Sequence, residues 1–321
     1  MSKTIAAIDG SILAYKASAA CEDRFIRVLH KPSGREKIFK NRTTFKSEVD
    51  LQQFSERDFE IEDDRNVEPI EYCLNTAKKM VESIVENTEA DSFEIWLDSD
   101  KPNFRETLPF PQPYKGHRVG IKPYYLNDVK QYLKGKFKAK ECFGIENDDM
   151  LVIRQYQSLS GEEPARVIAC TTDKDNMQTG PGTWLYNFDK MEKPFCMPKS
   201  EPLGKLWLDS GKPRGYGFLW LAYQIIYGDK VDNLNPRFIS GDRFGEKAAY
   251  NALKGLDSKK KIVSKITELY KKWYPVPVQY IDQNSEEVTM SWEDMLNLYG
   301  SGAYMLRSEN DRFDYKRLLD E

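Results

Sequence analysis

The sequence is poor in the residues that build zinc sites and disulfide frameworks. Its 321 residues include two histidines and five widely spaced cysteines, and no two cysteines form a CxxC pair. An odd number of scattered cysteines does not make a disulfide framework, and so few histidines argue against a zinc site. We expect reduced thiols, mostly buried, at Cys21, Cys73, Cys142, Cys170 and Cys196.

Long hydrophobic runs are also absent. No apolar stretch approaches the ~20 residues that cross a bilayer, and Asp9 interrupts the short apolar run near the N-terminus, where a signal peptide would stay apolar. The 40% hydrophobic and 12% aromatic content is typical of a soluble globular protein of one large domain or two smaller ones. We expect a cytoplasmic protein with no membrane partner.

Two common catalytic motifs are missing. There is no GxSxG nucleophile motif, and His30 and His117 lie in no triad-like setting. There is no GxxxxGK[ST] phosphate loop, which disfavours nucleoside triphosphate hydrolysis.

Carboxylates, in contrast, recur where apolar runs end. Asp9 follows TIAAI, Asp98 follows FEIWL and Asp173 follows RVIACTT, with further acids at Glu146, Asp148, Asp149, Asp175, Asp229 and Asp232. In open α/β folds the carboxyl ends of strands border the ligand crevice. Carboxylates gathered there repel one another unless a cation lies between them, and Mg²⁺ or Mn²⁺ prefers such oxygen ligands. The pattern predicts a multi-carboxylate metal site.

The distribution of charge indicates a polyanionic partner. The net charge is −3, but the chain without those nine acids would carry +6. Basic residues bunch at Lys115 to Lys122 and at Lys130 to Lys140. A basic rim around an acidic centre suits a polyanion bound through metal ions. Taken alone, each basic run fits a solvated surface equally well.

Apolar periodicity predicts alternating strands and helices. We expect strands at 4–9, 92–98, 139–149 and 165–173, and helices at 11–21, 68–87, 124–134 and 149–159. Such alternation favours an α/β fold with a mainly parallel central sheet flanked by helices. Short strands at 183–208 should close the edge of that sheet. Trp96, Trp184, Trp207 and Trp220 are expected in the core, and Asp100 in solvent.

Two regions differ from this pattern. Residues 26–40 predict a hairpin, and the charged stretch that follows to Asn66 predicts an exposed insertion or loop. Beyond Pro213 the chain reads as helical, with helices at 217–227, 258–273 and 291–299 and a glycine-containing turn at 243–249 that opens another. We therefore expect a core domain at 1–212, with an insertion at 21–66, and a helical region at 213–321.

Five motifs in order resemble one family. They are Asp9-Gly10-Ser11, LDSDKPNFRETLPFPQPYKGHR at 97–118, GIENDD at 144–149, TTDKD at 171–175 and GDKVDN at 228–233. Together they resemble the bacteriophage and bacterial 5′→3′ exonucleases, the flap endonuclease family that includes phage ribonuclease H. Each motif alone is weak, but five in the right order are specific. The resemblance implies a PIN-like, resolvase-like nuclease core followed by a helix-three-turn-helix region.

The resemblance also implies a set of metal ligands for two or more Mg²⁺ or Mn²⁺ ions. One group comprises Asp9, Asp98, Glu146, Asp148 and Asp149, and the other Asp173, Asp175, Asp229 and Asp232. Asp175 and Asp232 could hold an ion through water. Lys115 and Arg118 match the basic pair that contacts the scissile phosphate, where fixed cations stabilise developing charge.

Further residues match the family's nucleic-acid contacts. Tyr114 would stack on a splayed terminal base, and residues 239–250 would grip one strand through a helix-three-turn-helix with a bound K⁺. The usual Gly-Ile-Gly of that turn is Arg243-Phe244-Gly245 here, which leaves the K⁺ site open. Arg105 could contact phosphate or pair with a nearby acid. The candidate DNA-binding residues are Tyr114, Arg105, Lys122, Arg243, Gly245 and Lys247.

The implied activity is that of a metal-dependent 5′→3′ exonuclease or flap endonuclease. It would hydrolyse phosphodiesters at 5′ ends of duplex or branched DNA, with RNA primers in hybrids as further substrates, and leave 5′-phosphates. A monomer serving phage replication beside a polymerase or single-strand binding protein, in the host cytoplasm, fits this activity. A PIN-type ribonuclease and a non-catalytic binder of branched DNA are the rival hypotheses.

Single members of the acidic set have structural alternatives. Asp9 at a strand end could cap the following helix, and Asp148 and Asp149 could simply complement a helix dipole. The ordered set favours the ligand interpretation over these alternatives.

Overall fold

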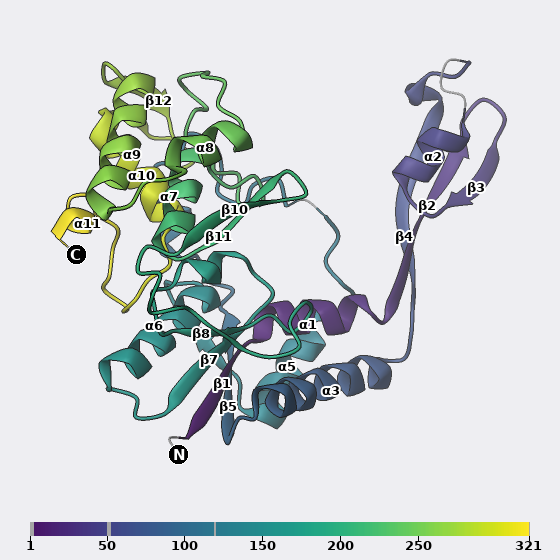
Figure 1. The fold of residues 1–321 in the computed structure, drawn as a ribbon. Helices are drawn as coiled ribbons and strands as arrows, with labels where there is room; N and C mark the ends of the chain where they lie inside the picture. The colour runs from purple at the N-terminus through teal and green to yellow at the C-terminus, as the bar shows by residue number, and fades with distance from the viewer. Residues whose placement is uncertain (1–2, 50–52, 119, 321) are drawn as a thin grey trace. The chain divides into compact units, whose positions relative to one another are not determined.

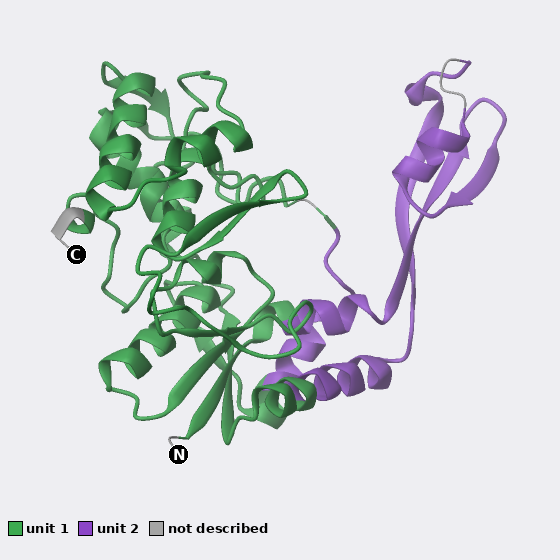
Figure 2. Cartoon of the chain, in the orientation of Figure 1, with its two compact units in different colours: residues 1–12, 82–120, 134–321 green, residues 13–81, 121–133 purple. Residues whose placement is uncertain are grey.

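The computed structural model describes residues 3–49, 53–118 and 120–320 (Figure 1). The chain divides into two compact units (Figure 2). The first unit comprises Met1–Ile12, Glu82–Gly120 and Lys134–Glu321, and the second Leu13–Val81 and Ile121–Leu133. The domain boundary expected between residues 212 and 213 falls inside the first unit, within a strand.

A mainly parallel sheet forms the centre of the first unit, as the sequence predicts. Its strands are β1 (Thr4–Asp9), β5 (Ser92–Asp98), β6 (Lys140–Cys142), β7 (Arg166–Cys170), β8 (Trp184–Tyr186) and β9 (Phe195–Cys196). Within the described residues their order is β6-β5-β1-β7-β8-β9. Every neighbouring pair is parallel except β8 and β9, which are antiparallel.

The apolar run of β1 explains its central place. Ala6, Ala7 and Ile8 are fully buried, as expected for a parallel strand covered on both faces. Helix α6 (Asn147–Ser160) packs against β1, β5 and β7, and Leu151 joins the core beside Ala7. The helix ends at Gly161, whose left-handed φ of 84° terminates it.

The strand order creates a switch point beside β1. The chain goes from β1 to β5 and β6 on one side, and then to β7 and β8 on the other. Ligands of open α/β sheets bind outside the carboxyl ends of the strands at such a point. Asp9 and Asp98 are the last residues of β1 and β5, so the fold delivers both to this edge.

The C-terminal part of the first unit is largely helical. Its helices are α7 (Phe218–Tyr227), α8 (Glu246–Leu253), α9 (Lys259–Trp273), α10 (Trp292–Ala303) and α11 (Arg317–Asp320). Helix α7 is apolar and buried along its length, and it contacts α8, α9 and α10. This part also contains a hairpin of β12 (Val278–Ile281) and β13 (Glu287–Met290). Two shorter elements lie earlier in the first unit, namely α4 (Phe104–Thr107) and the 3-10 turn η2 (Asp175–Gln178).

The expected sheet edge is partly wrong. β8 and β9 do extend the central sheet, but among the described strands β10 (Lys205–Asp209) pairs only with β11 (Lys212–Tyr216), in a separate hairpin. Trp207 on that hairpin is 38% exposed and is not a core residue, because a two-stranded hairpin leaves one face uncovered. Trp220 is buried as expected, whereas Trp96 and Trp184 are half-buried.

A three-stranded antiparallel sheet dominates the second unit. Its elements are β2 (Glu22–His30), β3 (Arg35–Phe39), α2 (Arg42–Glu48), η1 (Glu56–Asp58) and β4 (Phe59–Val67), together with residues of α1 (Gly10–Ala19), α3 (Ile70–Thr88) and α5 (Leu126–Phe137), which extend into both units. The predicted hairpin is confirmed. Of the two alternatives for the charged stretch to Asn66, a loop is wrong for Phe59–Val67, because β4 pairs with β2 along its whole length, whereas residues 50–52 lie outside the described residues.

Charge pairing explains how an acidic stretch forms a strand. Asp64 of β4 accepts a hydrogen bond from Arg27 at 2.6 Å, and Asp63 accepts one from Arg42 at 2.8 Å. The first is a cross-strand pair between β2 and β4, which stabilises a sheet modestly, and the second ties β4 to α2. The charges mask the apolar contribution of Phe59 to the small core, so the sequence pattern resembles a loop.

Two expectations from composition concern the cysteines and membrane-spanning helices. The five cysteines are free thiols, four buried and Cys196 half-buried. Among the helices of the described ranges, none combines the length and apolar character needed to cross a membrane.

Gly228 shapes the loop that carries Asp229 and Asp232. It has φ 88° and ψ −174°, a region essentially reserved for glycine. A Cβ on Gly228 would lie 2.1 Å from the carbonyl oxygen of Leu234. The two N–H···O bonds between Asp229 and Leu234, at 2.9 and 2.7 Å, close the loop. Glycine is therefore required for the closed loop that presents both acids.

Gly228→Ala should lower the free energy of unfolding by about 3 kcal/mol or more, because it adds a backbone clash to conformational strain. Gly161→Ala is the matched control: its φ is also positive, at 84°, but a Cβ there would meet nothing within 4 Å. It should cost only about 1–2 kcal/mol. Urea unfolding monitored by circular dichroism measures both. Equal losses for the two variants would contradict the close-approach explanation.

Candidate functional site

The first acidic group is held together by Asn147. Its side-chain amide donates to Asp9 Oδ1 at 2.6 Å, and its backbone N–H donates to Asp98 Oδ1 at 2.9 Å. The Thr171 hydroxyl, at the end of β7, donates to Asp9 Oδ2 at 2.7 Å. Asp9 also accepts the backbone N–H of Ile12 at 2.9 Å, so it does cap the following helix as the structural alternative allowed. These bonds connect the ends of β1, β5 and β7 to the start of α6.

Burial and mutual repulsion raise the pKa values of two carboxylates in this group. Burial raises the pKa of Asp9 to about 7, with a further contribution from Asp98, although its hydrogen bonds work in the opposite direction. Burial also raises the pKa of Asp148 well above its usual range, reinforced by the charges of Asp9 and Asp173. The site therefore holds more negative charge than its immediate surroundings neutralise.

Hydrogen-bond acceptors also outnumber hydrogen-bond donors around these carboxylates. Asp98, Asp148 and Asp173 each accept a hydrogen bond at Oδ1, at 2.9, 3.0 and 2.9 Å. Among the hydrogen bonds of the described residues, none uses their Oδ2 atoms. Asn176 donates to Asp148, and its own buried Oδ1 has no partner within the described chain. Unsatisfied oxygens around a surplus of negative charge suit a hard cation.

A lysine neutralises part of the second acidic group. Lys174 forms an ion pair with Asp229 and lies 3.5 Å from Asp175. Burial raises the pKa of Asp175 to about 8, assisted by Asp173 and opposed by Lys174. Gln224 donates to the same carboxylate at 2.5 Å. The Lys174 ammonium thus provides the positive charge that a metal ion would otherwise supply.

The basic pair of the YKGHR motif lies against the loop of Gly228. The backbone N–H of Lys115 donates to the Asp232 carbonyl at 2.9 Å, and Lys115 adopts a left-handed φ of 56°. Its ammonium forms an ion pair with Glu146, and Arg118 donates to Asp232 Oδ1 at 2.5 Å. Both predicted phosphate contacts therefore lie beside predicted metal ligands.

These ion pairs determine the charge states. Burial alone would raise the pKa of Glu146, but Arg105 and Lys115 lower it below its usual value. Burial works to lower the pKa of Lys115, yet Glu146 and Asp232 raise it. Burial raises the pKa of Asp232, opposed chiefly by Lys115. Lys115 is therefore protonated at neutral pH.

Asp149 is not available as a metal ligand. Both of its oxygens accept hydrogen bonds from the fully buried Arg105, at 2.6 and 2.8 Å. The backbone N–H groups of Glu146 and Leu306 donate to it as well, each at 3.1 Å. Four donors saturate a carboxylate. The expectation that Asp149 binds metal is therefore corrected: it anchors Arg105.

Arg105 and Tyr114 are corrected for the same reason, because burial removes them from any DNA surface. Of the two alternatives for Arg105, the structure has the pairing with an acid. Tyr114 is 7% exposed, and its hydroxyl donates to Glu146 and to Asp232, each at 3.1 Å. Its ring packs against Phe110 and is not open to a base.

The remaining DNA-binding candidates are exposed. Arg243, Gly245 and Lys247 surround the start of α8, where Gly245 is the N-cap. Lys122 is exposed in the second unit. Their assignment to DNA stays a prediction.

The carboxylates do not form a ready metal centre. Across the described ranges, no group of three or more histidine, cysteine, aspartate or glutamate side chains is arranged to hold a metal ion. The counter-ions Lys174, Lys115 and Arg118 explain part of this, because they already neutralise acids of the second group and Glu146. The donor chemistry of Asp98, Asp148 and Asp173 nevertheless fits Mg²⁺ or Mn²⁺.

Several residues of the site were missed by sequence reasoning. Asn147, Thr171 and Lys174 lie inside the GIENDD and TTDKD motifs, so their position was the available signal. Asn176 and Gln224 carried no such signal, because an amide in a helical segment has no pattern that distinguishes it.

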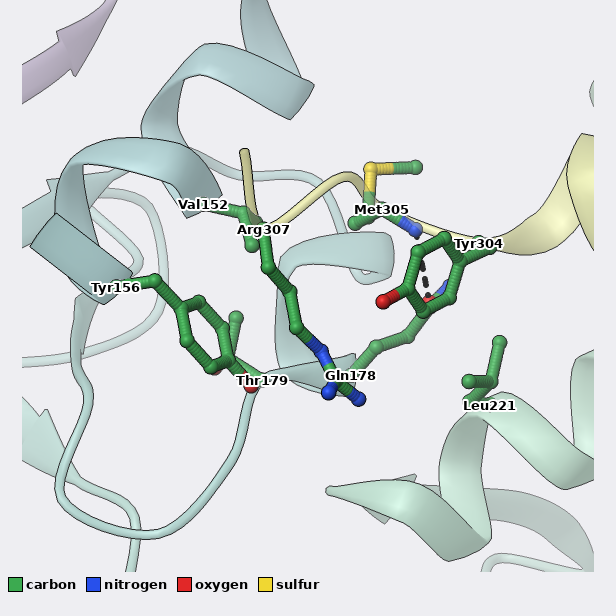
Figure 3. Close-up of a pocket in the computed structure, with 8 residues that line it drawn as sticks. All are labelled: Val152, Tyr156, Gln178, Thr179, Leu221, Tyr304, Met305 and Arg307. Carbon is green, nitrogen blue, oxygen red and sulfur yellow. Dashed lines mark hydrogen bonds between the residues drawn. The ribbon is translucent and has the colours of Figure 1, made fainter. Parts of the chain in front are cut away.

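A small cavity elsewhere in the first unit is not a substrate site. It measures about 10 Å³ and is lined by Val152, Tyr156, Gln178, Thr179, Leu221, Tyr304, Met305 and Arg307. Figure 3 shows the Met305 N–H donating to Gln178, at 3.3 Å. That volume holds at most a single water molecule.

Comparison with known proteins finds structural likenesses only. No family model matches the sequence. No curated protein matches it either. The structure is similar to that of the bacteriophage T5 5′-exonuclease with bound zinc, with a TM-score of 0.49 and 14% identity over 99% of this chain and 97% of that one. It is also similar to a bacteriophage T5 flap endonuclease in a pseudo-enzyme–product complex with DNA and metal ions, with a TM-score of 0.43 and 14% identity over the same shares.

Arg105→Met should lower the free energy of unfolding by about 3–5 kcal/mol, because it leaves Asp149 buried without its partner. Arg42→Met is the control, since Arg42 pairs with Asp63 where both side chains are largely exposed, and it should cost less than about 1 kcal/mol. Replacing both members of the buried pair, as Arg105→Met with Asp149→Leu, should recover part of the loss. Chemical unfolding tests this, and similar costs for the two single variants would refute it.

Asp9 should make stability depend on pH when a chelator is present. Its folded pKa of about 7 exceeds the ordinary 3.8, so the unfolded state loses its proton first. Stability is retained at low pH and lost as pH rises from about 4 to about 7. Asp9→Asn should therefore be more stable than the wild type by roughly 2–4 kcal/mol at pH 8 and nearly equal to it at pH 4.

Urea unfolding in EDTA at both pH values measures this difference. Asp100→Asn, at an exposed position, should match the wild type throughout. A difference for Asp9→Asn that is the same at both pH values would show that packing, not titration, is responsible.

Proposed function

We propose that this chain is a metal-dependent 5′-nuclease of the 5′→3′ exonuclease and flap endonuclease family. The observation that carries the proposal is a surplus of buried carboxylates at the switch point of a parallel sheet, next to the basic pair Lys115 and Arg118. A cation and a polyanion together would satisfy both sets of charges. The five ordered motifs support the same class.

Asp98, Asp148 and Asp173 each have an oxygen not used by the described residues, and they would hold one divalent ion after closing around it, because they are not arranged to do so in this structure. Asp9 would position Asn147 and add its negative charge to the site. Asp175, Asp229, Asp232 and Glu146 would hold a further ion only if Lys174 and Lys115 moved away from them. When bound, such ions supply water activation and charge neutralisation for phosphodiester hydrolysis.

The protein's own cations would act on the substrate. Lys115 is protonated at neutral pH, and Arg118 is half-exposed, with 49% of its side chain accessible. A scissile phosphate would compete with Glu146 and Asp232 for both side chains. Cations already fixed near the developing charge stabilise a transition state without reorganisation.

The proposal also includes the substrate, the product, the biological setting and the ions. The substrate would be the 5′ end of duplex or flapped DNA, or an RNA primer in a hybrid, and the product a 5′-phosphate. The chain would work as a monomer in phage replication, alongside a polymerase or single-strand binding protein. Mg²⁺ or Mn²⁺ would serve the carboxylates, and the 239–250 segment would bind duplex DNA, with K⁺ as its candidate ion.

A non-catalytic binder of branched DNA is the second candidate. The ion pairs of Lys174 and Lys115 favour it, because they already neutralise several acids without metal. Binding of flap DNA without turnover in Mg²⁺ and Mn²⁺ would identify such a binder. Cleavage of single-stranded RNA but not of duplex DNA would instead indicate the PIN-type ribonuclease.

Asp148→Asn and Asp173→Asn should each reduce cleavage of a 5′-labelled flap duplex by about 100-fold or more, since each removes a metal-binding charge. EDTA should abolish cleavage by the wild type. Asp100→Asn makes the same chemical change at an exposed position and should retain full activity. Gel analysis with Mn²⁺ measures the rates, and Ca²⁺ allows binding to be checked separately. Undiminished cleavage by both site variants would disprove the proposed function.

A further inference from the structure

A basic pocket lies beside the second acidic group, within the first unit. Its volume is about 200 Å³, and its lining includes Lys174 and Asp229, which also belong to that group. One wall is the β10–β11 hairpin, through Lys212, Pro213 and Arg214. Helix α7 lines another part of the pocket, and Figure 1 labels these elements.

The α7 wall of this pocket is a preformed aromatic surface. Trp220 and Tyr223 stack with ring centroids 5.2 Å apart and an interplanar angle of 9°, and Tyr223 and Tyr227 stack at 5.5 Å and 27°. The three residues recur at helical spacing along one side of α7. Trp220 and Tyr223 are each 5% exposed. The rings are therefore fixed before any ligand arrives.

Cations predominate around the opening. Lys174, Lys212, Arg214 and Lys230 line the pocket against two acids, Asp229 and Glu246. Lys212 and Lys230 are exposed. Arg214 lies 3.8 Å from Asp209, with both side chains about half exposed, and such pairs stabilise weakly. These cations can exchange their present contacts for a phosphate at little cost.

Size limits what the pocket can hold. Pockets for drug-sized ligands measure roughly 300–1,000 Å³, so about 200 Å³ accommodates a group no larger than one nucleoside. A duplex cannot enter. Aromatic surfaces and basic side chains are the combination by which proteins bind single strands, through base contacts and phosphate neutralisation.

We propose that this pocket binds the base and sugar of one nucleotide of a single nucleic-acid strand next to the carboxylates, with the phosphate at the opening. Lys212 and Arg214 contact its phosphate, and its base lies against Tyr227, the half-buried ring at the end of this stack. Lys174 and Asp229 border both the pocket and the second acidic group, so the bound nucleotide neighbours the reacting phosphodiester. This inference rests on the proposed function, which it extends by a substrate contact.

The test compares charge reversals on a single hairpin. Lys212→Glu and Arg214→Glu change residues that line the pocket, whereas Lys205→Glu changes an exposed lysine of the same hairpin that does not. Fluorescence anisotropy of a labelled short single-stranded oligonucleotide, in EDTA, gives the Kd without turnover. We expect the Kd to rise about 10-fold for each pocket variant and less than about 2-fold for Lys205→Glu. Circular dichroism verifies that the variants are folded.

Competition separates a strand from a free nucleotide, which share the same chemistry. A nucleoside monophosphate should displace the oligonucleotide only at far higher concentration, because it offers one phosphate. Monophosphate binding as tight as the oligonucleotide's would overturn the strand assignment. Equal losses for all three variants would also overturn the proposal, since general electrostatics would then suffice.

The outcome is distinguishable from failure of the nuclease proposal. If Lys212→Glu and Arg214→Glu cleave flap DNA with an unchanged KM and bind the oligonucleotide with an unchanged Kd, the pocket proposal is overturned and the nuclease proposal stands. Conversely, if the wild type binds the oligonucleotide more tightly than the pocket variants and yet cleaves nothing in Mn²⁺, the pocket proposal is supported and the nuclease proposal is overturned.

Discussion

The geometry of the acidic site depends on one buried ion pair. Arg105 is fully buried, and besides Asp149 it donates to the carbonyl oxygens of Gly302 and Tyr304, at 3.2 and 2.6 Å. It therefore joins the segment after β5, the first turn of α6 and the end of α10. Asn147 and Asp148 belong to that first turn, so the guanidinium holds in place the backbone that positions them. A bidentate pair is suited to this role, because its two parallel bonds fix orientation as well as distance.

The site around this pair is kept at an energetic cost. Buried carboxylates with raised pKa values, such as those of Asp9 and Asp175, oppose folding at neutral pH. Proteins commonly tolerate such local conflict where a ligand or reaction benefits from it. The apolar cores on either side supply the compensating stability, through α6 on the sheet and α7 among the C-terminal helices.

The sequence predicted the features that depend on short-range patterns. Apolar runs ending in an acid located β1, β5 and the delivery of Asp9 and Asp98 to one edge, because strand direction alone fixes that outcome. It could not choose a partner for Arg105, since Asp149 lies 44 positions away and only the folded chain brings them together. β4 escaped detection because Asp63 and Asp64 are paired with arginines of α2 and β2, which removes the contrast between buried and solvated positions. The prediction for Trp207 failed for another reason: this residue lies on the uncovered face of a two-stranded hairpin, whose other face packs against α7 and α8.

Lys174, Lys115 and Arg118 have a consequence for how the protein is assembled. Many small metalloproteins cannot fold before their metal arrives, because the ligands repel or remain unpaired without it. Here ammonium and guanidinium groups of the same chain occupy that role at part of the acidic site. The polypeptide can complete its fold whatever the local supply of divalent ions, and binding of such an ion at this part of the site would replace one positive charge with another.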